Sequence, residues 1–199
     1  MARTKVPTSN AGDVLTAAWQ NTYIKNNEAW HYQMLTPRNL WIGGWRPRET
    51  AGAGGPAVLT AGSNYFDYLA FDKDTKEYAW ANIPMPLNYD GGTITAKVYW
   101  SHPATTTNFA VAWKIAAVSL TNAEALNGAL GTAVQVNDSG GTEGVLYISD
   151  ATGPITIAGT PAAGKLVHFD IHRVADDATK DTLAVDAYLH GVLISYGLA

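Results

Sequence analysis

The sequence contains no cysteine, which excludes a disulfide framework, a thiolate metal site and a thiol nucleophile. Charged residues make up only 15% of the chain, well below the quarter that is usual in globular proteins. No run of about 18 apolar residues occurs, so we expect no insertion into a membrane. The opening MARTKVPTSNAGDV also lacks the apolar run of a signal peptide. We therefore expect synthesis and folding in a cytoplasm.

Motifs for catalysis and cofactor binding are missing as well. The chain has no Gly-x-Ser-x-Gly nucleophile elbow, no phosphate-binding loop and no dinucleotide fingerprint. The acidic turn FDKDTKEY, at residues 71–78, lacks the glycine and the distal glutamate of a calcium loop. The sequence thus predicts a protein that is not an enzyme and that holds no cofactor.

The composition that remains is that of a globular protein, with 47% apolar residues and seven tryptophans. The net charge of −4 argues against a general nucleic-acid binder. Basic residues predominate over residues 1–50 and acidic residues over the rest, which is typical of an arm that docks on an acidic surface. The low charge fits a protein that packs against other proteins, or a neutral β domain rich in Gly, Ala and Thr.

Residues 15–30, LTAAWQNTYIKNNEAW, have the periodicity of an amphipathic helix, with Thr16 as a suitable N-cap. A helix of this length is marginal alone and needs a partner surface, either its own domain or other chains. The segment TAGAGGPA at residues 50–57 predicts a linker that frees the helix, and this favours other chains. The predicted interface residues are the apolar stripe of the helix with one amide, and two further tryptophans: Leu15, Trp19, Tyr23, Asn26, Trp30, Trp41 and Trp45.

Beyond this linker the apolar residues alternate, as they do in half-buried strands. The long predicted strands lie at residues 93–100, 108–120, 165–174 and 182–196, the last interrupted at Gly191 by a bulge or bend. Shorter ones lie at 65–71, 78–83, 133–137, 145–149 and 155–158, and only residues 121–130 offer a short helix. We predict an all-β, jelly-roll-like antiparallel β-sandwich at residues 57–199, preceded by an N-terminal arm at residues 1–56 with one short amphipathic helix.

Two groups of side chains are candidate binding sites. His168, Asp170 and His172 alternate along one predicted strand and share a face, where they could bind zinc or iron. No further ligand follows at a familiar spacing, so a plain polar outer face is favoured. Exposed aromatic side chains could instead stack on sugars. The alternation places Trp100 and Trp113 in the core. It does not decide whether Tyr65, Tyr68 and Tyr78 lie in the core or on the surface.

Two segments resemble virion structural proteins of tailed bacteriophages. The first, DVLTAAWQNTYIKNN, is similar to a short N-terminal motif of Thr-Ala-x-x-Trp-Asn followed by an aromatic, a basic residue and Asn. Gln20 precedes the Asn, and the matching positions are Thr16, Ala17, Trp19, Asn21, Tyr23, Lys25 and Asn26. The second covers residues 77–196 and resembles a β-sandwich module of phage structural proteins.

The resemblance implies a non-enzymatic virion component that is made in the host cytoplasm. Such proteins are commonly homotrimers that decorate the capsid, form a short head fibre or sit on the tail, and their N-terminal segments anchor them. The implied partners are sister subunits and the major capsid protein. The alternative is a tail-associated module that binds a receptor or host glycan through surface aromatic side chains.

Overall fold

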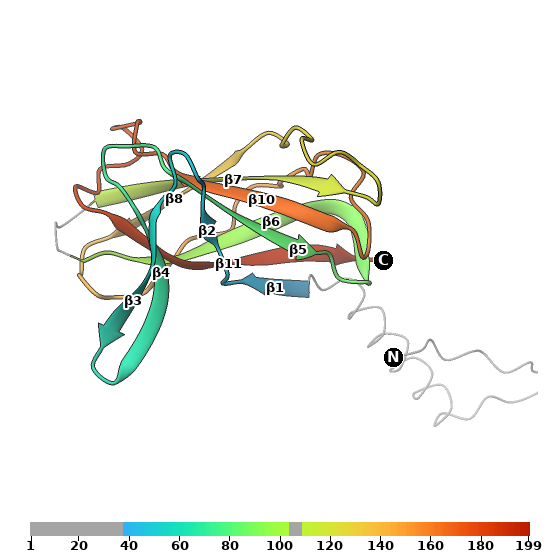
Figure 1. Ribbon diagram of the computed structural model, residues 1–199. Helices are drawn as coiled ribbons and strands as arrows, with labels where there is room; N and C mark the ends of the chain where they lie inside the picture. Colours follow the sequence, from blue (N-terminus) through green and yellow to red (C-terminus); the bar gives the residue numbers. More distant parts are fainter. Residues whose placement is uncertain (1–37, 104–108) are drawn as a thin grey trace, which may run out of the picture.

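A computed structural model describes residues 38–103 and 109–199 of the protein (Figure 1). These residues form eleven strands in two antiparallel sheets and contain no helix. The prediction of an all-β sandwich is confirmed, whereas the helix expected at residues 15–30 lies outside the described residues. No helix in the described ranges is long and apolar enough to cross a membrane.

The larger sheet, called sheet A, is built around the last strand of the chain. Its order is β3 (Gly54–Ala61), β4 (Asn64–Phe71), β11 (Ala187–Leu198), β6 (Tyr89–Ser101) and β9 (Tyr147–Ile148), and β1 (Arg38–Ile42) also pairs with β11. β4 pairs only with the first residues of β11, and β1 takes over farther along the same edge. The β3–β4 hairpin therefore extends beyond the sandwich (Figure 1).

The smaller sheet, called sheet B, carries the long central strands of the second layer. Its order is β2 (Arg46–Pro47), β5 (Tyr78–Pro84), β10 (Leu166–Arg173), β7 (Phe109–Leu120) and β8 (Val134–Gly140). From β4 to β11 most connections pass from one sheet to the other, so each sheet mixes early and late parts of the chain. Two layers with facing apolar sides are the standard way for such sheets to bury a core.

The core lies between the sheets and follows the alternation of the sequence. Trp113 in β7 is fully buried, and its ring meets Phe71 edge-on at 5.1 Å between centroids. The Trp100 indole is also buried, and its Nε1 donates a hydrogen bond to Asp138 Oδ2 at 2.8 Å. The predicted core position of Trp100 is confirmed, and none of the residues on the same inward face of β6 is more than 1% exposed: Ile94, Ala96, Val98 and Trp100.

The N-terminal part of the described chain differs from the arm and linker expected there. Residues 38–56 supply β1, β2 and the first residues of β3, and Ala53 is buried. Gly52 forms a bridge with Tyr78 of β5, and Gly54 pairs with Ala70 of β4, so the glycines that suggested a linker lie against neighbouring strands instead. Glycine permits such close backbone approach, which a sequence pattern does not distinguish from flexibility.

Two further local predictions have opposite outcomes. The short helix at residues 121–130 is wrong, because the segment is a series of exposed turns in which Ala123 has a φ of 64°. The bulge at Gly191 is confirmed by a register shift between β11 and β6. A Cβ at Gly191 would lie 2.3 Å from the Trp41 ring, so this glycine lets β1 pack closely on β11.

A buried ion pair joins the ends of several strands. Arg173, in β10, is fully buried and makes two hydrogen bonds to the Asp181 carboxylate, at 2.7 and 2.8 Å. Its other N–H groups donate to three backbone carbonyls, those of Phe71, Leu183 and Val185. All five guanidinium donors are therefore used, which is what a charge inside a protein core requires.

Replacement of Asp181 by Ala should destabilise the protein strongly, because it leaves the Arg173 guanidinium buried without its counter-charge. We expect the free energy of unfolding to fall by about 3–5 kcal/mol, measured by chemical denaturation. The control is Asp176→Ala, which removes the exposed ion pair with Lys76 and should cost less than about 1 kcal/mol. Equal losses in the two variants would contradict this account.

Candidate functional site

The outer face of sheet B carries most of the polar chemistry of the sandwich. Inward residues alternate with outward ones, so Tyr78, Trp80 and Asn82 of β5 share the outer face while Ala79 and Ala81 are buried. The register then sets the neighbours of each outward residue on β10: Asn82 opposite His168, Trp80 opposite Asp170 and Tyr78 opposite His172. The predicted shared face of the two histidines and the aspartate is thus confirmed.

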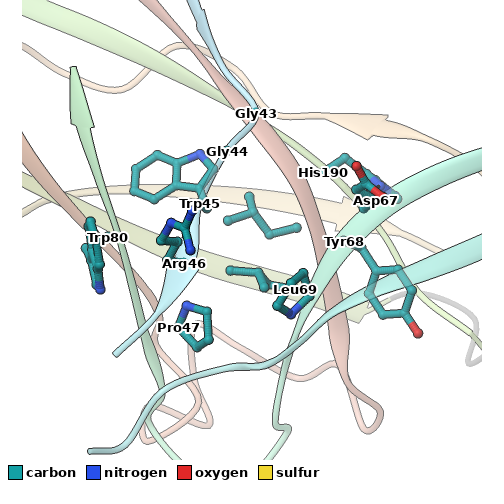
Figure 2. A pocket seen from close by; sticks show the side chains of 12 residues that line it. Gly43, Gly44, Trp45, Arg46, Pro47, Asp67, Tyr68, Leu69, Trp80 and His190 are labelled. Atoms are coloured by element: carbon teal, nitrogen blue, oxygen red, sulfur yellow. Dashed lines mark hydrogen bonds between the residues drawn. The ribbon is translucent and has the colours of Figure 1, made fainter. Parts of the chain in front are cut away.

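Trp80 is the central residue of this face because it lines two separate cavities. The first, of about 650 Å³, lies at the edge of the sandwich between β2 and β4, with Leu69 and Leu189 among its apolar residues. In Figure 2, Trp80 stands on one side of this cavity and Tyr68 on the other, with Arg46 between them. The second cavity, of about 490 Å³, lies over the sheet itself beside Asn82, His168 and the apolar loop residues Leu126 and Leu130.

Arg48 covers the middle of the polar row. Its Nη2 lies 2.5 Å from Asp170 Oδ2, and its guanidinium carbon lies 3.9 Å from the centre of the Tyr78 ring. The Asp170 side chain is only 6% exposed although it points outward, because this arginine lies over it. The arginine thus neutralises the carboxylate and fixes the tyrosine ring in a cation–π contact. This pairing could not be read from sequence, since the two residues are 122 positions apart.

His168 is held as a neutral imidazole beside the tryptophan. Its ring stacks near Trp80 at 6.1 Å between centroids, and its Nδ1 donates to Asn82 Oδ1 at 2.8 Å. Burial lowers the pKa of His168 below its usual value, Asp170 raises it in part, and Arg48 lowers it again. Near neutral pH, Nε2 is therefore available as a hydrogen-bond acceptor next to the indole.

The metal-site hypothesis for this strand finds no support in the geometry. His168 is bonded to Asn82, Asp170 is paired with Arg48, and His172 Nδ1 lies 3.9 Å from the Asp170 carboxylate. That Nδ1 is buried and makes no hydrogen bond. Within the described ranges, no three His, Asp or Glu side chains are grouped in a way that could hold a metal ion.

The predicted interface residues are found in different environments. Leu15, Trp19, Tyr23, Asn26 and Trp30 lie outside the described residues. Trp45 is a core residue, 5% exposed, and its Nε1 donates to the Ile42 carbonyl at 2.9 Å. Trp41 is 48% exposed on the outer face of sheet A, on the other side of the sandwich from Trp80. There its ring meets Tyr99 edge-on, with 4.9 Å between ring centroids.

Trp41 belongs to an apolar surface on sheet A that the sequence analysis did not identify. A cavity of about 280 Å³ lies there, lined by residues of β1, β3, β4, β6 and the loop before β9: Trp41, Leu59, Phe66, Tyr99 and Leu146 among them. The hairpin beside it exposes further apolar side chains, Val58 and Tyr65. We call this set the hairpin surface. Its members come from four separate parts of the chain, namely β1, the β3–β4 hairpin, β6 and the loop before β9, so only the fold brings them together.

The chain matches no protein-family model and no curated protein. Among solved structures it is similar to the xylan-binding module CBM15, with 15% identity, a TM-score of 0.42, and coverage of 81% of this chain and 97% of that one. The CBM22-2 xylan-binding domain of Paenibacillus barcinonensis Xyn10C has 14% identity and a TM-score of 0.41, with coverage of 78% and 92%. A tailspike protein of bacteriophage CBA120 has 12% identity and a TM-score of 0.35, with coverage of 80% of this chain and 19% of that one. At these TM-scores no family is assigned, and the function has to be inferred from the chain's own residues.

The electrostatics of the site predict how His168 titrates. Arg48→Met removes a nearby cation and frees the Asp170 charge, and both changes favour the imidazolium. We expect the pKa of His168 to lie below its usual value in the parent protein and to rise in this variant, measured by NMR of the imidazole C–H signals. Arg38→Met, on sheet A, is the matched control and should leave the titration unchanged. An unchanged or lower pKa in Arg48→Met would show that Arg48 does not act on His168.

Proposed function

We propose that this jelly-roll-like sandwich is a carbohydrate-binding protein and that the outer face of sheet B holds the sugar. The observation that carries the proposal is the position of Trp80, partly exposed and bordered by cavities on two sides. Their volumes lie in the range usual for sites that bind small molecules. An indole offers a flat apolar surface for the C–H face of a sugar ring, at a low cost in side-chain entropy.

The surroundings of Trp80 supply the hydrogen bonds that a sugar needs. Sugar hydroxyls both donate and accept, so a site must present both kinds of group. Asn82 and His168 supply an amide and a free ring nitrogen on one side, and Arg46 supplies donors on the other. The Arg48–Asp170 pair fixes the strand positions between them. A fixed aromatic surface with a few polar groups around it is the usual construction of a ligand site.

A second candidate function, a subunit of a virion, is favoured by the hairpin surface. β3 is the edge of sheet A, and the whole β3–β4 hairpin contains one charged residue, Asp67. Soluble monomers usually protect such an edge with charges or with a covering segment. An open apolar edge fits a second copy of this chain, and self-association is what the phage resemblance implies for such proteins. In this role the chain is a homotrimeric capsid, head-fibre or tail component that lies on the virion.

The sugar-binding proposal predicts that Trp80→Ala strongly weakens carbohydrate binding without unfolding the sandwich. Suitable probes are xylan oligosaccharides, a β-1,3-1,4-mixed-linked tetrasaccharide and β-1,4-galactotriose, because structural neighbours of this chain are xylan-binding domains or carbohydrate-binding modules in complex with these oligosaccharides. Loss of a central aromatic anchor should weaken the affinity for the preferred probe at least about tenfold in calorimetry. Trp41→Ala, on the other sheet, is the matched control and should bind normally. If the parent protein binds no carbohydrate, or if Trp80→Ala binds equally well, the proposal is wrong.

The virion proposal predicts a specific change in oligomeric state. Light scattering of the full chain should give an oligomer, and Phe66→Asp should reduce it to a monomer because a charge would be desolvated in the contact. Phe66 is 48% exposed in the described chain. Leu87→Asp is the control, since Leu87 is 87% exposed in the β5–β6 loop and lies outside the hairpin surface. A parent protein that remains monomeric at high concentration would rule out this use of the surface.

A further inference from the structure

We propose that the sheet B site selects acidic glycans, whose sugar units carry a carboxylate or sulfate group. The inference rests on the proposed sugar-binding function and goes further by naming the class of ligand. It depends on two cations of the outer face, Arg46 and Lys114, and on the carboxylates near them.

Arg46 stands directly beside the tryptophan. It is the register partner of Trp80 across the β2–β5 pair, and strands so paired lie about 5 Å apart. Both residues line the first cavity, and in Figure 2 Arg46 stands between Trp80 and Tyr68, nearer to Trp80. An acidic group on a sugar stacked at Trp80 would therefore lie within reach of this arginine. The planar guanidinium can make two parallel hydrogen bonds to a carboxylate or sulfate.

Lys114 provides a second cation on the same face. It lies opposite His172 in β10 and Gln135 in β8, two strands away from Trp80. From the strand spacing and the rise per residue, it stands about 12 Å from the tryptophan along the face. A chain of acidic sugars running across the sheet from β2 towards β8 would meet one cation beside Trp80 and another near its far end.

Neither cation is already neutralised within the described chain. Among residues 38–103 and 109–199, the ion pairs use Arg48, Lys73, Lys76, His172 and Arg173 but not Arg46 or Lys114. The nearby Asp170 is neutralised by Arg48, so it does not repel an anion. The face thus has an excess of positive charge, although the whole chain has a net charge of −4. Such a local reversal of sign attracts a ligand of opposite charge.

One carboxylate opposes this attraction and thereby limits where the acidic group can lie. Asp67, from β4, lines the first cavity on the side away from Trp80, near His190. An acidic substituent is repelled there and attracted at Arg46. The favoured orientation therefore places the acidic group at the β2 end of the site, and Asp67→Asn should strengthen binding of acidic probes.

The test uses a pair of probes that differ only in charge. Oligogalacturonate is compared with the same oligosaccharide after its carboxyl groups have been reduced to alcohols, and sulfated dextran oligosaccharides are compared with unmodified dextran. Binding to the full-length protein is measured by calorimetry at low and at high salt. The inference predicts tighter binding of at least one acidic probe than of its neutral partner, and a smaller difference at high salt because exposed charges are then screened. The two probe pairs distinguish carboxylate from sulfate.

The variants connect the effect to the two cations. Arg46→Gln and Lys114→Gln should each weaken the affinity for the acidic probe about fivefold. The affinity for the neutral probe should stay nearly unchanged. Lys97→Gln changes the charge equally on the exposed side of sheet A and should have no effect. Equal binding of acidic and neutral probes, dependent on Trp80, would overturn the inference and leave the sugar-binding function intact. If the protein binds no carbohydrate, or binds tightly only to oligo(dT), an anionic probe that is not a glycan, then both the acidic-glycan inference and the sugar-binding function are overturned.

Discussion

The bidentate contact between Arg173 and Asp181 is the interaction on which the rest of the structure depends. A buried guanidinium tolerates few missing partners, so the five groups that accept its hydrogen bonds must all be held in place. The accepting carbonyls belong to the end of β4 and to the segment before β11, both of sheet A. The Asp181 carboxylate also accepts the backbone N–H of Ala112 in β7. One ion pair therefore ties both sheets together at one end.

The same strand carries the candidate site on its other side. β10 points Arg173 into the core and, three residues earlier, Asp170 outward to Arg48. Because side chains alternate along a strand, fixing the inner arginine also fixes the orientation of the outer row. His168 and Trp80 then keep their stacked arrangement without a dedicated loop to position them. The proposed sugar-binding surface is thus preorganised by the core beneath it, which would reduce the entropy lost on binding.

The sequence predicted those parts of the fold that depend on local periodicity. Alternation in β6 and β7 was sufficient to place Trp100 and Trp113 in the core, and alternation in β10 placed His168, Asp170 and His172 on one face. The linker predicted at residues 50–57 was wrong, because a glycine that allows close packing and a glycine that allows flexibility have the same local sequence pattern. The ion pairs of Arg48 and Arg173 join residues from different strands, and only tertiary structure specifies such pairs.

Trp80 is a candidate site residue that the sequence pattern alone could have indicated. In YAWANI the small residues Ala79 and Ala81 alternate with Tyr78, Trp80 and Asn82, and the presence of an amide in the second set marks it as the outer one. A large aromatic on the polar side of a strand is a stronger indication of binding than one on its apolar side. The two cavities beside it could not be inferred, since they depend on β2, β4 and the loop at residues 121–130.

The two outer faces of the sandwich differ in chemistry, and this difference makes the two proposed functions compatible. Sheet A presents the hairpin surface, which is apolar and suits contact with another copy, while sheet B presents a polar, cationic face that stays open to solvent. An open face binds a single sugar segment weakly, because much of the ligand remains hydrated. Association through sheet A would place several Trp80 faces in one particle, and simultaneous binding would then raise the overall affinity without any new contact. Self-association on one face can thus compensate for weak sugar binding on the other.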